Sequence, residues 1–142
     1  MDPEHLTLSL LRSLTDVSAA AGRVIGEVFE GFELTESAAA LLWALDQEPP
    51  PASMREIARL LGCDPSNVTL MSDRLHRAGL VERRPHPTDG RSRLLALTPQ
   101  GLELLGKLRS ELHARSPLGA LTRKEQQRLD VLLAKARGVH PS

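Results

Sequence analysis

The sequence lacks the features of several large classes of protein. Its single cysteine cannot form an internal disulfide, so nothing favours secretion. No apolar run is long enough to span a bilayer, and the first four residues lack the basic region of a signal peptide. No paired carboxylates, catalytic triad or phosphate-binding loop stands out. These absences predict a cytoplasmic protein that has no membrane partner and is not an enzyme.

Aromatic residues and net charge are also scarce. Aromatic residues make up 2% of the chain and tyrosine is missing, so leucine, alanine and valine must fill a largely helical core. The net charge is zero, but residues 55–93 hold eight arginines against five acids, which leaves +3. The remainder holds ten basic and thirteen acidic residues, which leaves −3. This modest contrast predicts weak non-specific affinity for DNA.

No metal or other cofactor is expected, because the histidines show no metal-ligand spacing and one cysteine adds little to them. The five are His5, His76, His86, His113 and His140.

Two helices are predicted before the first loop. Apolar residues at helical spacing predict a long helix from Leu6 to about Glu30. Thr35 is the expected N-cap of a second helix, in which Trp43 is interpreted as a core residue. Residues 46–52 contain three consecutive prolines and are predicted to form a loop.

A helix-turn-helix is predicted next. Ser53 and Glu56 have the spacing of a capping box, and the helix that they open stops at Gly62, which suits a left-handed C-cap. Asp64 is then the expected N-cap of a second short helix, Pro65 to Ala78. Two short helices joined by so tight a turn have the geometry of a helix-turn-helix.

A β-hairpin and two helices complete the chain. Residues 80–84 and 93–97 read as paired strands around a loop with an Asp-Gly turn signal. Thr98 and Pro99 open a long helix, and Thr122 with Glu125 has the pattern of a second capping box that opens the last one. The terminal helices carry more apolar surface than a lone chain would cover, which predicts a dimer.

A helix-turn-helix followed by a hairpin with an arginine at its tip is a winged helix-turn-helix, a mainly α fold with a small β-hairpin. The expected function is sequence-specific binding of double-stranded DNA, with the helix Pro65 to Ala78 in the major groove and Arg91 in the minor groove. Val68, Met71, Leu75 and Ala78 share the face predicted to pack inward. The residues predicted to contact DNA are Ser66, Asn67, Thr69, Leu70, Arg74, Arg77, Arg84, Asp89, Arg91 and Arg93. In this interpretation the Asp89 side chain pairs with that of Arg91 and holds its direction.

Each of these assignments has a structural alternative. Ser66 and Thr69 can merely cap the helix, and Arg91 can form a surface ion pair of little energetic value. Cys63 is interpreted as a buried structural residue of the turn, with a redox sensor as the alternative. A winged helix that binds other proteins, with little specific DNA binding, is the alternative for the whole chain and is favoured by its neutral charge.

The combination of Asp89-Gly90-Arg91 with Leu97-Thr98-Pro99-Gln100-Gly101 resembles the MarR family of bacterial transcriptional regulators. The resemblance implies a single domain, 1–142, with a DNA-binding lobe at about 34–98 and dimerisation helices at about 5–31 and 99–138. It also implies a homodimer on a pseudo-palindromic operator, acting as a repressor. A small aromatic or anionic effector would relieve repression from a cleft between the lobes, which Trp43 would line if it is not core.

Overall fold

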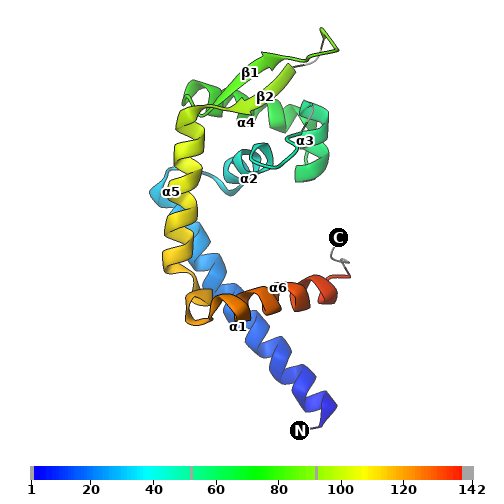
Figure 1. Ribbon diagram of the computed structural model, residues 1–142, viewed down its shortest axis with the longest axis vertical. Coiled ribbons are helices and arrows are strands. Elements are labelled where there is room, and N and C mark those ends of the chain that lie inside the picture. Colours follow the sequence, from blue (N-terminus) through cyan, green and yellow to red (C-terminus); the bar gives the residue numbers. More distant parts are fainter. Residues whose placement is uncertain (1, 52, 92, 139–142) are drawn as a thin grey trace. The chain divides into compact units, whose positions relative to one another are not determined.

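The computed structural model describes residues 2–51, 53–91 and 93–138 and confirms the predicted mainly helical fold with one hairpin (Figure 1). Its elements, in chain order, are α1 (Pro3–Gly31), α2 (Glu36–Leu45), α3 (Met54–Leu61), α4 (Pro65–Arg77), β1 (Val81–Pro85), β2 (Arg93–Leu97), α5 (Pro99–Arg115), the 3-10 helix η1 (Pro117–Ala120) and α6 (Arg123–Ala136). Each predicted helix is present, and η1 is an addition that the sequence patterns did not indicate.

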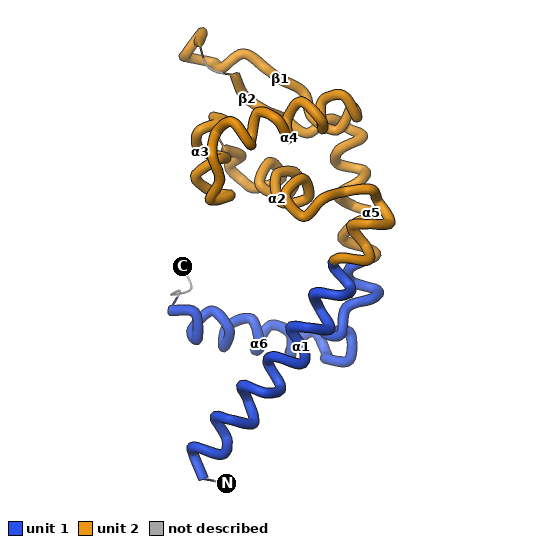
Figure 2. The backbone as a smooth tube through the Cα atoms, turned by 180° about the vertical axis from the view of Figure 1, so that it is seen from behind, with its two compact units in different colours: residues 1–25, 112–142 blue, residues 26–111 orange. Residues whose placement is uncertain are grey.

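The chain divides into two compact units (Figure 2). Unit 1 consists of residues 1–25 and 112–142, and unit 2 consists of residues 26–111. Unit 2 therefore holds α2, α3, α4, the hairpin and most of α5. The functional division at residues 34 and 98 that the sequence suggested stays a prediction.

Unit 2 has an aliphatic core built around α2, as expected of a chain with so few aromatic residues. Four of the ten residues of α2 are buried, and α2 contacts α3, α4 and β2. The largest fully buried side chains among the described residues all belong to this unit, and they are Leu41, Leu42, Ile57, Val68, Ser72, Val81, Leu105 and Leu108. The core thus fixes the helix-turn-helix and the hairpin to one another.

The helix ends of unit 2 follow the predicted capping pattern with one exception. Thr35 accepts a hydrogen bond from the Ala38 N–H, and Ser53 accepts one from the Glu56 N–H, both at 3.1 Å. Gly62 has the left-handed conformation, with φ of 64°. Asp64 stands at the N-cap position of α4, but its side chain makes no capping hydrogen bond. The Asp64 backbone carbonyl accepts the Asn67 N–H at 3.0 Å in its place.

The second strand lies at 93–97 as predicted, and the first is offset by one residue from the prediction. β1 pairs antiparallel with β2 from Val81 opposite Leu97 to Pro85 opposite Arg93. Leu80 was predicted to begin the strand, but it closes the end of α4 instead. Its N–H donates to the Leu75 carbonyl at 3.0 Å, and its own carbonyl accepts from the Thr98 N–H at 3.1 Å. Pro85 is tolerated at the strand end, where it lacks only one ladder donor.

The start of α5 packs very closely against the end of α4. The Thr98 hydroxyl donates to the Gly79 carbonyl at 2.6 Å and accepts from the Gly101 N–H at 3.1 Å. A Cβ atom on Gly101 would lie 2.2 Å from the Leu80 carbonyl oxygen, so only glycine fits there. Gly79 itself has a φ of 77°. The contacts at this junction, which join Gly79, Leu80, Thr98 and Gly101, explain why the chain carries Leu-Thr-Pro-Gln-Gly here. They also fix the base of the hairpin in place.

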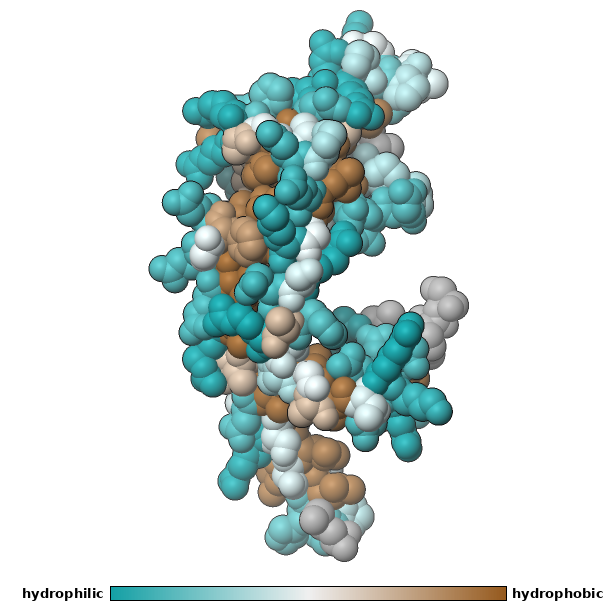
Figure 3. Space-filling model, turned by 60° about the vertical axis from the view of Figure 1, so that its left-hand side comes forward, coloured by the Kyte–Doolittle hydropathy of each residue, from teal (hydrophilic) through white to brown (hydrophobic). Residues whose placement is uncertain are grey.

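Unit 1 is built differently, because none of its described residues is buried. Its large exposed apolar side chains are Leu6, Leu8, Leu10, Leu11, Leu14, Val17, Ile25, Leu118, Val131, Leu132 and Leu133. Figure 3 shows hydrophobic side chains at the surface near the start of α1. Among the described helices, none is both long and apolar enough to cross a membrane.

The last helix of unit 1 begins with a complete capping box, as predicted. The Thr122 hydroxyl accepts from the Glu125 N–H at 3.3 Å, and Glu125 Oε2 accepts from the Thr122 N–H at 2.8 Å. Hydrogen bonds from the backbone and then the side chain of Thr122 lower the pKa of Glu125 below its usual value.

Candidate nucleic-acid interface

Helix α4 packs one face on the core of unit 2 and leaves the other face in solvent. Val68 and Leu75 are buried and Met71 is half-buried, as the helical wheel predicted. Ala78 was predicted to face inward but is exposed, because α4 ends at Arg77 and Ala78 is the C-cap residue. Ser72 is fully buried, and its hydroxyl donates to the Val68 carbonyl at 2.5 Å. That hydrogen bond satisfies a polar group in the core, which a simple apolar pattern could not predict.

The outward face of α4 carries most of the residues predicted to contact DNA. The exposed members are Ser66, Asn67, Thr69, Leu70, Arg74 and Arg77. Half of the Leu70 surface is accessible, which leaves an apolar group free to meet an apolar partner such as a thymine methyl. The Thr69 hydroxyl donates to the Pro65 carbonyl at 3.0 Å, and Arg77 Nε donates to the Asp73 carbonyl at 3.3 Å. Both are bonds within the helix that keep these side chains close to its surface.

The loop at the end of the hairpin, here called the wing tip, is ordered by side chains that accept backbone hydrogen bonds. Asp89 Oδ1 accepts from the Arg91 N–H at 3.0 Å. This contact lets Asp89 position Arg91 through its backbone, where the sequence had suggested a pairing of the two side chains. His86 Nδ1 accepts from the N–H groups of Thr88 at 3.2 Å and of Asp89 at 3.0 Å. No role was predicted for His86 from the sequence. The one local signal for its hydrogen bonds to the loop backbone was its position three residues before Asp89.

The arginines of the hairpin fall into two kinds. Arg83 forms an ion pair with Asp73 of α4, and Arg84 forms one with Glu82, to which its Nε also donates at 2.8 Å. Arg91 and Arg93 are exposed, and no acidic side chain of the described residues forms an ion pair with either. The ion pairs restrain Arg83 and Arg84, whereas the guanidinium groups of Arg91 and Arg93 remain available for other anions.

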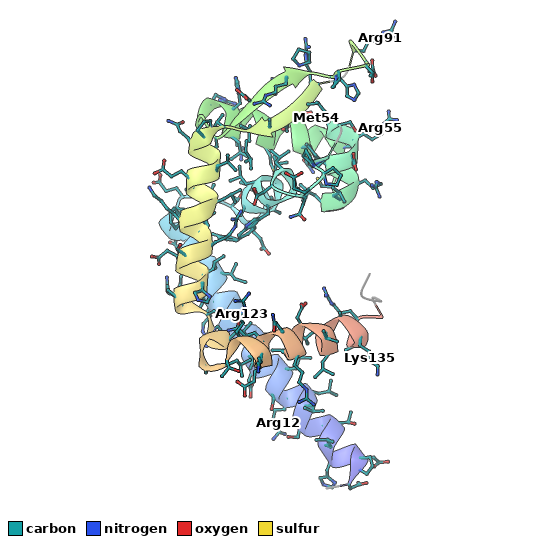
Figure 4. The ribbon with its side chains drawn as sticks, viewed as in Figure 1. Arg12, Met54, Arg55, Arg91, Arg123 and Lys135 are labelled. Atoms are coloured by element: carbon teal, nitrogen blue, oxygen red, sulfur yellow. The ribbon has the colours of Figure 1, made fainter. Side chains whose placement is uncertain are left out.

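A hollow of about 520 Å³ lies between the start of α3 and the wing tip. It is lined by Ser53, Met54, Arg55, Asp89, Arg91 and Arg93. In Figure 4 the side chains of Arg55 and Arg91 extend from their two elements toward the same side of the unit. Arg55 was not predicted to be a site residue, because it precedes the start of α4 by ten residues. Only the fold brings it close to the wing.

A second hollow, of about 530 Å³, lies between α2 and α4. Its lining includes Cys63, Asn67, Met71 and Arg74. Cys63 is therefore half-buried at the edge of a hollow, and not fully buried as its position in the turn had indicated. A group of three side chains suited to hold a metal ion is not found within the described part of the chain, and His140 lies outside it.

Trp43 packs against a second aromatic ring of unit 2. Its ring lies 5.6 Å from that of the buried Phe29, centroid to centroid, at an angle of 49°. Trp43 itself is half-buried and does not line either of the two hollows described above. This packing accounts for its place in the core, and a role in a ligand cleft stays a prediction.

Comparison with known proteins identifies the fold that carries this candidate interface. Residues 34–92 match the MarR family. The HTH-type transcriptional regulator YkoM of Bacillus subtilis is 37% identical over 93 residues, which cover 63% of this chain and 59% of YkoM. The YusO structure from B. subtilis superposes with a TM-score of 0.76 at 25% identity, over 99% of this chain and 100% of that one. The wild-type MarR structure from E. coli gives a TM-score of 0.67 at 27% identity, over 89% and 96% of the two chains.

These similarities define a winged helix-turn-helix protein. The chain is similar to proteins of the MarR family, whose members are transcriptional regulators and not enzymes. The resemblance carried by the wing and the Leu-Thr-Pro-Gln-Gly sequence is thereby confirmed.

Proposed function

We propose that this protein is a homodimeric transcriptional repressor that binds a pseudo-palindromic operator in the cytoplasm. The observation that carries the proposal is the exposed face of α4 in the same compact unit as the outward Arg91. A helix in the major groove reads base edges, and an arginine at the wing tip enters the adjacent minor groove, where the potential is most negative in A·T-rich DNA.

Two copies are needed to read a palindrome, and unit 1 supports their association. Its described residues include eleven large exposed apolar side chains and none that is buried. A surface of this kind is typical of an interface between protein molecules. Each α4 would then meet one half-site, with the half-sites one helical turn apart or a multiple of it.

The regulation that we propose is a shift between two dimer conformations. A small aromatic or anionic effector would favour a spacing of the two α4 helices that misses successive major grooves. It can weaken DNA binding only to the extent that its affinity differs between the two conformations. Trp43, the single tryptophan, offers a fluorescence signal for such binding.

The test begins with selection from a randomised duplex library, followed by fluorescence anisotropy on the selected duplex at fixed salt. Arg91→Ala is expected to weaken binding by about 1–3 kcal/mol, as for loss of a specific arginine contact, with the fold intact by circular dichroism. Asp89→Ala is expected to give a smaller loss, because Asp89 would orient Arg91 without touching DNA.

Lys107→Ala is the matched control, since it also removes one positive charge from unit 2 but lies on α5, where it pairs with Glu103. Affinity unchanged in the folded Arg91→Ala dimer would mean that the wing does not read DNA. A library that yields no enriched duplex would favour the alternative function, a module that binds other proteins.

A further inference from the structure

We propose that Arg55, at the start of α3, and Arg93, at the wing-tip end of β2, jointly bind one phosphate of the DNA backbone beside the minor groove that Arg91 enters. This inference rests on the proposed function and adds a contact to it. It assigns the hollow between α3 and the wing tip as a phosphate site and Arg55 as a DNA-positioning residue.

The charge in this hollow is unbalanced. Three of its lining residues are arginines, and Asp89 is the single acidic residue among them. No acidic side chain of the described residues forms an ion pair with any of the three arginines. The other arginines nearby are paired, since Arg59 lies 3.9 Å from Glu56 and Arg83 and Arg84 have carboxylate partners. Like charges gathered without a partner repel one another, and an anion that binds among them removes that cost.

A phosphate is the anion that fits this arrangement best. A guanidinium group presents a planar set of N–H donors that matches two phosphate oxygens, and its charge is present at every physiological pH. Arg55 and Arg93 are exposed, so a phosphate can reach them without rearrangement of the core. Ser53 at the rim is half-buried, and its hydroxyl oxygen already accepts the Glu56 N–H, so the arginines supply the recognition.

The source of the phosphate follows from the place of Arg91. The minor groove is narrow, about 6 Å across, and a phosphate backbone borders it on each side. A side chain that enters the groove therefore brings neighbouring groups of the protein against one of these backbones. Arg55 and Arg93 line the same hollow as Arg91, so they are the groups that would meet it. Contacts to phosphate fix the register of the protein on the duplex and carry no sequence information.

The experiment compares Arg55→Gln, Arg93→Gln and the double variant in the 142-residue chain, with Arg59→Gln as the control. Arg59 lies one turn further along the same helix and outside the hollow. Anisotropy is measured on the selected duplex and on a scrambled duplex of equal length, over a series of salt concentrations. Arg55→Gln is expected to lower affinity about tenfold on both duplexes and to reduce the slope of log K against log salt by about one.

Two further readouts make the assignment specific. If Arg55 and Arg93 hold the same phosphate, the double variant loses less affinity than the sum of the single losses predicts. A scan with single methylphosphonate substitutions should find one phosphate per half-site whose neutralisation weakens the wild type but not the double variant. The scan also separates a backbone phosphate from a free anion, because only the backbone phosphate has a fixed position in the duplex.

The outcomes distinguish this inference from the function on which it rests. If the wild type enriches a duplex and Arg55→Gln behaves like Arg59→Gln in affinity and salt slope, the phosphate site is refuted while DNA binding stands. A loss confined to the selected duplex would also overturn it, since it would make Arg55 a base-reading residue. If the wild type binds no duplex, the proposed function fails first.

Discussion

The two compact units of this chain differ in whether their apolar side chains are buried or exposed. Unit 2 buries its aliphatic side chains, and among the described residues only Leu60, Leu70 and Leu102 of this unit are large, apolar and exposed. Unit 1 leaves all of its described residues at least partly accessible. Unit 2 therefore has a buried core of its own, whereas the helices of unit 1 need a further surface to cover them.

The difference suits the division of labour that we propose, in which unit 2 reads DNA and unit 1 dimerises. A DNA-reading surface has to keep its geometry, and a fully packed core gives α4 and the wing that rigidity. A dimerisation surface has to be apolar and accessible until its partner arrives. The residues that match the MarR family, 34–92, all lie in unit 2.

The largest effect is expected from a cavity in the core of unit 2. Leu41 is completely buried, so Leu41→Ala should lower the free energy of unfolding by about 2–5 kcal/mol. Urea unfolding followed by circular dichroism measures it. Leu60→Ala is the control, because Leu60 is 54% exposed in the same unit and its truncation should cost far less. Equal costs for the two variants would show that unit 2 does not fold on this core.

The second effect concerns unit 1. Leu10 is 60% exposed on α1, and Leu10→Asp should raise the dimer dissociation constant by about 100-fold or more, since a charge would be buried in the interface. Sedimentation equilibrium at micromolar concentration measures the change. Leu60→Asp introduces the same charge at a similarly exposed site of unit 2 and should leave the dimer intact. A wild-type chain that sediments as a monomer would contradict both the dimer and the palindromic operator.

The third effect tests the junction that joins α4, the wing and α5. Gly101→Ala should destabilise unit 2 by about 1–3 kcal/mol, because the added methyl group would meet the Leu80 carbonyl and force α5 away. Gly106→Ala on the same helix is the control, since a Cβ atom there meets nothing within 4 Å. Thermal unfolding of both variants gives the comparison. Equal stability of the two would show that the close approach at Gly101 is not a constraint.

Much of unit 2 could be predicted from local signals in the sequence. The caps at Thr35 and Ser53 and the left-handed Gly62 obey short-range rules that need no tertiary information. Leu80 departs from its predicted strand because a contact with Thr98, eighteen residues away, decides its role. Ser72 and Arg55 were missed for the same reason. The hydroxyl of Ser72 is satisfied inside the core, and Arg55 reaches the wing only when α3 and the hairpin have folded together.

The smallest effect is expected from the capping box of α6. None of the described residues of unit 1 is buried, so its helices rely on local hydrogen bonds of this kind. The pKa of Glu125 is lowered in the folded chain, so its carboxylate stabilises α6 fully above the ordinary pKa of glutamate, and this contribution is lost as the pH falls through the lowered value. Glu125→Gln keeps a capping side chain but has no charge to titrate. Thermal unfolding at about pH 7 and about pH 3 should therefore show the wild type more stable than Glu125→Gln at the higher pH, with the difference narrowed at the lower pH. Lys124→Gln, at the neighbouring position, controls for loss of a surface charge. If the difference between wild type and Glu125→Gln stays the same at both pH values, the carboxylate charge does not hold the start of α6, and unit 1 depends on its partner surface alone.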